Sequence, residues 1–161
     1  MQKITPFLWF DTQAEEAVNF YSSLFKDSKV GNASRYDEAG AAASGRPEGS
    51  VMTVSFQLNG QEFTAINGGP HFKFTEAISF VVNCENQEEV DYYWEKLSAV
   101  PQSEMCGWLK DKYGLSWQIV PTVLSKLLTD KDAKKSQRVM QAMLQMKKIN
   151  IAELEKAYKE Q

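Results

Sequence analysis

The feature that most constrains the fold of this chain is an internal repeat, in which a strand, a helix and a run of strands follow one another twice. The first copy ends in a pair of strands around Asn59-Gly60, and the second ends in a pair around the turn Asp111 to Gly114. Asn-Gly is a strong hairpin signal because both residues tolerate the positive φ angles of a tight turn, and Gly114 gives the second turn the same freedom. Such a module cannot bury a sheet face alone, so the repeat predicts two modules that pair.

The helices support the same division of the chain. Apolar residues recur at helical spacing in each copy, and Thr12 to Glu15 has the spacing of a capping box at the start of the first helix. Asn86 can cap the second helix. The two apolar stripes align at a constant offset, Ala17, Phe20, Tyr21 and Leu24 with Val90, Tyr93, Trp94 and Leu97.

The last strands of the two copies also align, Thr64-Ala65-Ile66 with Trp117-Gln118-Ile119. In the second of these strands, apolar Trp117 and Ile119 alternate with Ser116 and Gln118. Alternation of this kind predicts a strand with one face on a core and the other toward a wetter surface. That wetter face is where we expect the functional site.

Residues 37–49 are rich in Ala, Gly, Ser and Pro and have no apolar periodicity. They predict a mobile loop, which is either a lid or simply disordered. After Pro121 the pattern becomes helical to the end of the chain. Three methionines, Met140, Met143 and Met146, recur there at helical spacing and suit packing on the sheet or on a second subunit. We therefore expect one domain at residues 1–121, built from modules 1–67 and 76–121, and a helical C-terminal extension at residues 122–161.

The composition excludes several classes of partner. A net charge of −3 provides no basic surface for nucleic acid. No apolar run is long enough to cross a membrane, and the N-terminus does not read as an export signal, so we expect a cytoplasmic protein. In that compartment Cys84 and Cys106 are expected to be reduced.

Several stretches carry a family resemblance: Phe10-Asp11, Glu15-Glu16-Ala17, Phe20-Tyr21, Trp117-Gln118 and residues 138–143. They resemble the vicinal oxygen chelate superfamily, which includes glyoxalase I and bleomycin-resistance proteins. They are most similar to its PhnB-like branch, often labelled 3-demethylubiquinone-9 3-methyltransferase. The resemblance covers nearly the whole chain and implies an α+β fold, in which two βαβββ modules of about eight strands form a curved, mainly antiparallel sheet cup with the helices outside.

The methyltransferase label has no support in the sequence pattern. A usual methyl-donor site lies on a doubly wound sheet, at a Gly-rich turn between the first strand and a helix. Gly68-Gly69 instead follows a late strand and precedes Pro70. In metal-dependent members of the superfamily, four ligands point into the cup, and the resemblance carries these positions over to Thr5, Ala65, Ala77 and Gln118. Only Gln118 can ligate well, so we expect no metal and no other cofactor.

Counting alternate residues from these positions predicts a ligand pocket that mixes aromatic, small and hydrogen-bonding side chains. Its residues are Phe7, Trp9, Phe63, Ala65, Ser79, Ser116 and Gln118. The alternative is a collapsed interior in which Gln118 bonds to a serine or to the backbone. His71, the only histidine, is a weak candidate for a catalytic base.

The sequence thus favours metal-independent binding of a small, partly apolar molecule by a homodimer. The open alternative is an enzyme of the superfamily, that is, a lyase, a dioxygenase or, by the family label only, a methyltransferase acting on a ubiquinone precursor. Whether any reaction is catalysed is not decided by the residues.

Overall fold

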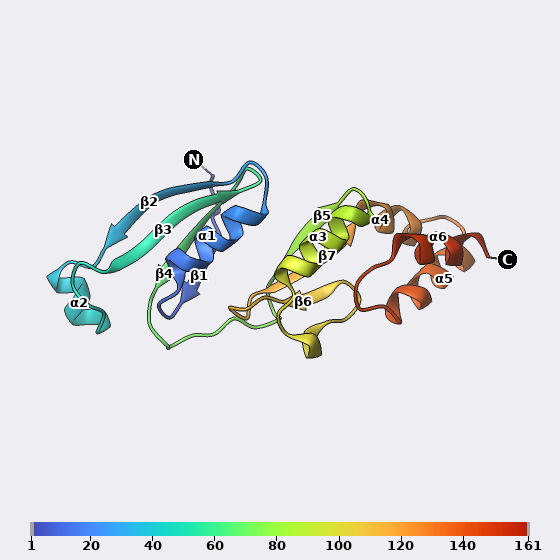
Figure 1. Cartoon of the computed structure of the whole chain (residues 1–161). Helices are drawn as coiled ribbons and strands as arrows, with labels where there is room; N and C mark the ends of the chain where they lie inside the picture. The colour runs from blue at the N-terminus through green and yellow to red at the C-terminus, as the bar shows by residue number, and fades with distance from the viewer. Residues whose placement is uncertain (1, 161) are drawn as a thin grey trace. The chain divides into compact units, whose positions relative to one another are not determined.

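The computed structural model describes residues 2–160 and divides into two compact units, residues 1–73 and residues 74–161 (Figure 1). Unit 1 has the element order βαβαββ and unit 2 has the order βαββ followed by three helices. The α+β class predicted from the sequence is confirmed, as is the helical C-terminal extension. No helix among the described residues is long and apolar enough to cross a membrane.

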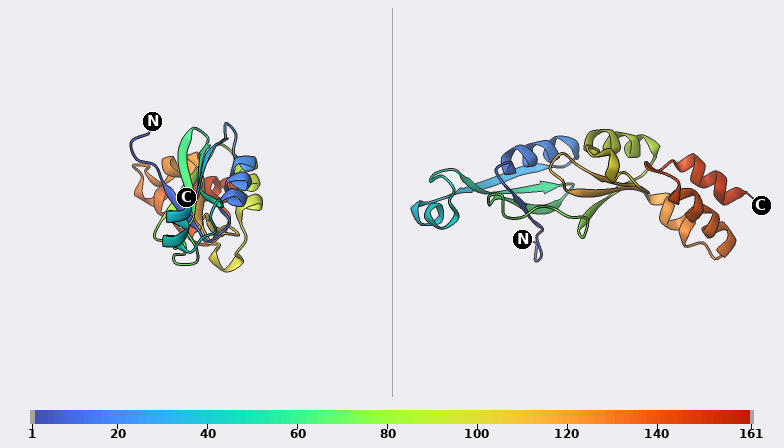
Figure 2. Two further views of the ribbon diagram at one scale, coloured as in Figure 1. Left: turned by 90° about the vertical axis from the view of Figure 1, so that its left-hand side faces the viewer. Right: turned by 90° about the horizontal axis from the view of Figure 1, so that it is seen from below.

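Unit 1 contains a four-stranded sheet in the order β1-β4-β3-β2, in which β1 runs parallel to β4 and the other pairs are antiparallel. Helix α1 packs on one face of this sheet (Figure 2) and buries Ala17, Val18 and Tyr21. The predicted turn Asn59-Gly60 joins β3 to β4, and both residues have positive φ angles. The elements are β1 Phe7–Phe10, α1 Ala14–Leu24, β2 Lys29–Arg35, α2 Glu38–Ser44, β3 Val51–Leu58 and β4 Gln61–Asn67.

The start of α1 is held by β4 rather than by the predicted capping box. The N-cap residue is Gln13, whose side chain makes no capping bond. The buried Asn67 instead accepts a hydrogen bond from the backbone N–H of Ala14 at 2.8 Å and donates one to Glu15 at 2.6 Å. The Thr12 prediction is wrong because a side chain distant in sequence satisfies the end of the helix, which local spacing cannot reveal.

The segment predicted as a mobile loop, residues 37–49, contains the helix α2. The Asp37 side chain accepts a bond from the Gly40 backbone N–H, and Gly45 ends the helix in the left-handed region with φ +71°. The prediction of an unstructured loop is therefore wrong. Alanine-rich segments with no apolar stripe can still form a short helix when both ends are capped.

Unit 2 contains a three-stranded sheet in the order β5-β7-β6, in which β5 is parallel to β7 and β6 is antiparallel to it. Helix α3 packs on one face of this sheet (Figure 2) and is capped by Asn86, as the sequence predicts. The elements are β5 Ser79–Cys84, α3 Gln87–Leu97, the 3₁₀ turn η1 Pro101–Ser103, β6 Trp108–Lys110, β7 Ser116–Pro121, α4 Thr122–Leu128, α5 Ala133–Leu144 and α6 Ile151–Lys159.

The second module has one strand fewer than the first, so the described residues form seven strands and not the predicted eight. Where the repeat predicts a further strand, the chain makes the η1 turn at Pro101–Ser103 and a single bridge between Met105 and Trp108. Pro101 supplies no N–H for a ladder, which favours a turn at this point.

The hairpin between β6 and β7 is organised around a buried carboxylate. Asp111 Oδ1 accepts hydrogen bonds from the backbone N–H groups of Tyr113 at 2.8 Å and Leu115 at 3.0 Å. Its Oδ2 accepts one from Trp117 Nε1 at 2.9 Å. The side chain is 1% exposed, so these contacts compensate for the cost of burying it.

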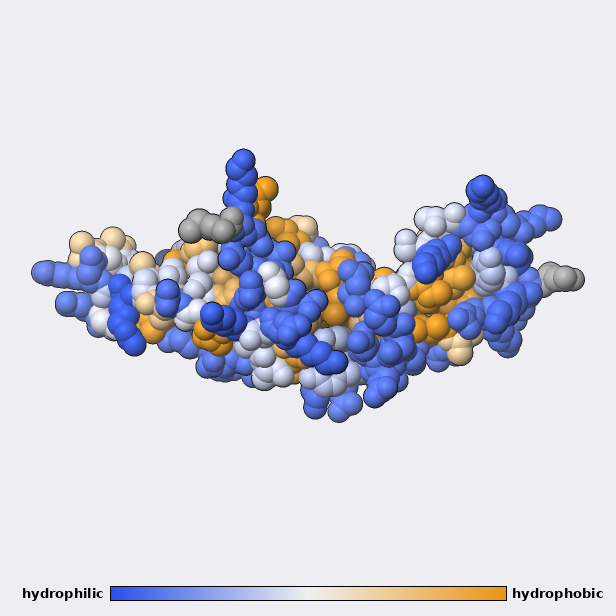
Figure 3. Space-filling model, turned by 90° about the horizontal axis from the view of Figure 1, so that it is seen from above, coloured by the Kyte–Doolittle hydropathy of each residue, from blue (hydrophilic) through white to orange (hydrophobic). Residues whose placement is uncertain are grey.

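The C-terminal helices pack around a small apolar core of their own, which consists of Leu124, Leu127, Val139, Ile149 and Leu154. Met143 and Met146 pack against this core, while Met140 and Leu144 on α5 are exposed. Figure 3 shows a patch of hydrophobic surface over this helical part of the chain. Backbone bonds from Cys106 N to Met146 O and from Gly107 N to Lys147 O join the extension to the start of β6.

Candidate functional site

Two rows of side chains cross the face of the unit-2 sheet that lies opposite α3. In the register of the sheet, Ser116 on β7 stands between Ser79 on β5 and Lys110 on β6. Gln118 stands in the next row, between Val81 and Trp108. Since alternate residues of a strand share a face, this surface carries a polar row beside a mixed one.

The predicted face of Ser79, Ser116 and Gln118 therefore agrees with the register of unit 2. Trp117 and Ile119, the residues of the face expected to lie on a core, are buried on the other side of the sheet. Gln118 Nε2 donates a hydrogen bond to Ser79 Oγ at 2.9 Å. This contact is the serine partner that the collapsed-interior alternative anticipates, so the amide is already paired in the protein alone.

A cavity of about 420 Å³ is lined in part by three residues of this face, Trp108, Lys110 and Ser116. Apolar wall is supplied by Met105, Trp108 and Leu109, and polar groups are supplied by side chains from η1, β6 and β7. All of the lining residues belong to unit 2: Glu76, Gln102, Ser103, Met105, Cys106, Trp108, Leu109, Lys110 and Ser116. An apolar wall with a few convergent polar groups is the usual make-up of a small-molecule site.

Ser116 is the most unusual of the residues that line this cavity. The residue is 1% exposed, and Ser116 Oγ has no hydrogen-bond partner among the described residues. A buried hydroxyl without a partner costs free energy of about 1–3 kcal/mol. The group that satisfies this hydroxyl is therefore expected to come from outside the chain.

An ion pair lies at the side of the cavity. Lys110 Nζ is 2.5 Å from Glu76 Oε1. The hydrogen bond from Lys110 lowers the pKa of the Glu76 carboxyl, and the positive charge of Lys110 acts in the same direction. The two side chains differ in exposure, with 22% for Lys110 and 65% for Glu76.

In unit 1 the predicted pocket residues divide between the two faces of the sheet. Phe7 pairs with Thr64, and Trp9 pairs with Ile66. Phe63 and Ala65 alternate with these partners and lie on the α1 face, where they are 5% and 0% exposed. The prediction that all four residues share one face is therefore wrong.

The error has a definite origin in the aligned last strands of the repeat. Matching Ala65 with Gln118 placed a core residue opposite a residue of the other face. A shift of one position turns every side chain of a strand to the opposite face. In its own sheet Gln118 lies on the face away from the helix. The residues of β4 on the corresponding face are Thr64 and Ile66, the neighbours of Ala65.

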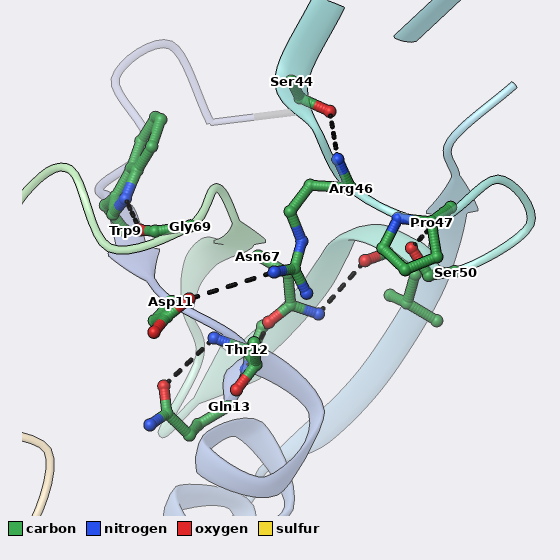
Figure 4. Close-up of polar contacts among 12 residues, drawn as sticks. Trp9, Asp11, Thr12, Gln13, Ser44, Arg46, Pro47, Ser50, Asn67 and Gly69 are labelled. Carbon is green, nitrogen blue, oxygen red and sulfur yellow. Dashed lines mark hydrogen bonds and ion pairs between the residues drawn. The ribbon is translucent and has the colours of Figure 1, made fainter. Parts of the chain in front are cut away.

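Unit 1 also holds a polar cluster that the sequence did not indicate (Figure 4). Arg46 Nη1 lies 3.9 Å from Asp11 Oδ1, and the buried Arg46 Nε has no partner among the described residues. Nearby, Trp9 Nε1 donates a hydrogen bond to Gly69 O at 2.9 Å. Arg46 lies just after α2. An arginine in this segment was the only sequence signal for the cluster, and the prediction of an unstructured loop gave it no defined position.

The remaining candidates are not brought together. His71 is exposed on the loop after β4 and does not line the cavity. Burial raises the pKa of the Cys84 thiol to about 12, so that thiol stays protonated. In residues 2–160 no three or more His, Cys, Asp or Glu side chains are grouped so that they could hold a metal ion.

The two sheets and the helix on one face of each define a modular α+β protein and not a doubly wound nucleotide-binding protein. A family profile described as 3-demethylubiquinone-9 3-methyltransferase matches residues 2–120. The chain belongs to this family, and the resemblance predicted from the sequence is confirmed. The family name alone does not establish an activity for this chain.

Among solved structures, the PhnB protein from Bacillus cereus is 45% identical over 75% of this chain and 100% of its own, with a TM-score of 0.62. A protein from Pseudomonas aeruginosa is 16% identical over 75% of this chain and 98% of its own, with a TM-score of 0.55. The second likeness supports the fold only. No curated protein matches the chain. The helical extension after residue 120 lies outside the matched family region.

Proposed function

We propose that this protein binds a small, partly apolar molecule, without a metal, on the face of the unit-2 sheet opposite α3. The observation that carries the proposal concerns Ser116, a residue that lines a cavity of about 420 Å³ and whose buried hydroxyl lacks a partner among residues 2–160. Trp108 and Met105 offer apolar contact area around it.

The cavity suits a ligand of modest size. Small-molecule pockets commonly enclose about 300–1,000 Å³ and combine apolar walls with a few polar groups that fix orientation. Ser116 is one of the polar residues that line the cavity, and the bonded pair of Gln118 and Ser79 lies next to it on the same face of the sheet. That Phe7 and Trp9 of unit 1 contact a ligand stays a prediction.

The proposal is tested by Ser116→Ala. Because the hydroxyl has no partner among the residues that the structure describes, its removal is expected to leave the melting temperature unchanged or raised. The same change is expected to weaken the best hit from a fragment screen by about five- to tenfold, which corresponds to one hydrogen bond. A residue with a purely structural role would show the opposite pattern.

The screen is read by amide chemical shifts of labelled protein, with Ser136→Ala as the control. Ser136 lies on α5, and its hydroxyl bonds within its own helix. Fragment-induced shifts that avoid residues 102–118, or equal affinity for wild type and Ser116→Ala, would show that the site lies elsewhere.

An enzyme of the superfamily has no comparable observation in its favour, because the candidate base His71 belongs to unit 1 and is absent from the cavity wall. Methyl transfer, which the family's name specifies, finds no support in the sheets of this chain, because neither is the doubly wound sheet on which a usual methyl-donor site lies. We also propose that the protein is cytoplasmic and forms a homodimer. Exposed apolar side chains such as Phe7 and Ile78 support the dimer. Sedimentation at micromolar concentration tests the dimer, and a monomer would refute it.

A further inference from the structure

We infer that the molecule bound in this cavity is a small monocarboxylic acid with an aromatic or branched body, whose carboxylate pairs with Lys110 in place of Glu76. The inference rests on the proposed function and specifies the ligand of that same site. It is carried by the positions of Lys110, Glu76 and Ser116 around the cavity.

Lys110 is placed to meet a ligand. It lies directly across from Ser116 in the register of β6 and β7, and both residues line the cavity. Paired residues of neighbouring strands project their side chains from the same face of a sheet, so the side chains of Lys110 and Ser116 leave the same face. A carboxylate bound by the ammonium of Lys110 would have its second oxygen free to accept a hydrogen bond from the hydroxyl of Ser116.

Glu76 lies where a ligand carboxylate can replace it. Its side chain is 65% exposed, against 22% for Lys110, so Glu76 contacts Lys110 from the solvent side. Glu76 precedes β5 and lies outside any strand or helix, in the turn that leads to Ser79. Ion pairs with an exposed partner contribute little stability, so another anion can replace this one at small cost.

The charge of Lys110 also restricts what can fill the cavity. A ligand that covers the cavity removes water from Lys110, and a cation cut off from water needs an anion in contact. A neutral ligand cannot replace Glu76 as the ionic partner of Lys110, whereas a carboxylate can. A phosphate monoester suits the cavity less well, because it carries close to two negative charges and Lys110 is the one cation among the described residues that line the cavity.

The body of the ligand is indicated by the walls. Trp108 and Met105 line the cavity, and Met105 is 66% exposed in the free protein. An exposed methionine beside a tryptophan suits a flat ring, because the thioether adapts its shape and contacts the ring edge favourably. One or two rings fill the available volume.

The test compares three probes of similar shape, 2-naphthylacetate, 2-naphthylacetamide and 2-naphthyl phosphate, by titration calorimetry on the full chain. Wild type is expected to bind the acetate about tenfold more tightly than the acetamide, as a hydrogen bond between charged groups provides. Glu76→Gln is expected to tighten the acetate about two- to fivefold and to leave the acetamide unchanged. Lys110→Met is expected to abolish the preference for the acid.

Glu104→Gln is the matched control, because Glu104 pairs with Lys147 in the same unit but does not line the cavity. A second readout is the carboxyl signal of Glu76, whose titration is expected to move toward the ordinary range of glutamate when the acetate binds. Tighter binding of the phosphate, equal binding of acetate and acetamide, or weaker acetate binding by Glu76→Gln would each overturn the inference.

The outcomes also separate this inference from the proposed function. If other fragments shift Ser116 while the acetate does not bind, the carboxylate assignment is wrong and the binding site stands. If no probe or fragment perturbs the cavity at millimolar concentration, both are wrong.

Discussion

Replacing Asp111 is expected to destabilise unit 2 more than any other single polar substitution in the β6–β7 hairpin. The carboxylate is 1% exposed and accepts three N–H donors, two from the turn backbone and one from Trp117. Asp111→Ala leaves these three buried donors without their acceptor. At about 1–3 kcal/mol for each unpaired group, offset by the relief of burying a charge, we expect a loss of about 3–5 kcal/mol in the free energy of unfolding.

Asp111→Asn separates the two sides of the carboxylate. Its amide oxygen can still accept from the backbone N–H groups of Tyr113 and Leu115, but its NH₂ group then faces the N–H of Trp117. We expect a smaller loss of about 1–3 kcal/mol. In a Trp117→Phe background the facing donor is gone, so the same substitution is expected to cost about 1 kcal/mol less.

The assay is urea denaturation followed by far-ultraviolet circular dichroism for Asp111→Ala and for the four proteins of the Asp111→Asn and Trp117→Phe cycle, with Asp132→Ala as an exposed capping control. Asp132 caps α5 at the surface, and a loss of about 1 kcal/mol is expected there. A loss below about 1 kcal/mol for Asp111→Ala, or no coupling between positions 111 and 117, would refute the reasoning.

Three further predictions concern stability. Gly107→Ala should lower the free energy of unfolding by about 2–3 kcal/mol, because φ is +86° and a Cβ would meet Ile119 O at 3.0 Å. Gly49→Ala, where φ is +77° but the space is open, should cost about 1 kcal/mol, and equal melting temperatures for the two variants would contradict this. Asn67→Ala should cost about 2–3 kcal/mol in urea melts, since the Ala14 N–H loses its acceptor, and a neutral result would show that the cap is unimportant. Because the pKa of Cys84 is raised in the folded protein, above about pH 9 the thiol ionises in the unfolded chain while it stays protonated in the folded one. The free energy of unfolding should therefore fall as the pH rises toward 12, and Cys84→Ala should make this fall less steep. The same dependence of stability on pH in both proteins would contradict the prediction.

Local signals in the sequence predicted much of this fold. Asn59-Gly60 and Gly114 located both hairpins because positive φ angles are a property of single residues. The helical stripes located α1 and α3, and Asn86 located a cap, because periodicity and capping act within one turn. The face of Ser79, Ser116 and Gln118 followed from alternation within β7 and β5.

The errors arose where the decisive contact is distant in the chain. The cap of α1 comes from Asn67, more than fifty residues away, which no local pattern contains. The assignment of Phe63 and Ala65 failed because it transferred a register between repeats, and a single-residue offset reverses the face of a strand. The ion pair of Lys110 with Glu76 depends on how a turn meets an edge strand, which the residues alone do not encode.

The measurement that tests the central claim most directly is a crystallographic fragment screen of the full chain with aromatic acids, amides and alcohols. We predict ligand density against Trp108 and Met105, with a ligand oxygen within hydrogen-bond distance of Ser116 Oγ. Crystals of Ser116→Val, in which two methyl groups fill that space and the hydroxyl is gone, should show no density there. Fragments that bind elsewhere in both proteins, or that occupy the cavity equally well in Ser116→Val, would contradict the account.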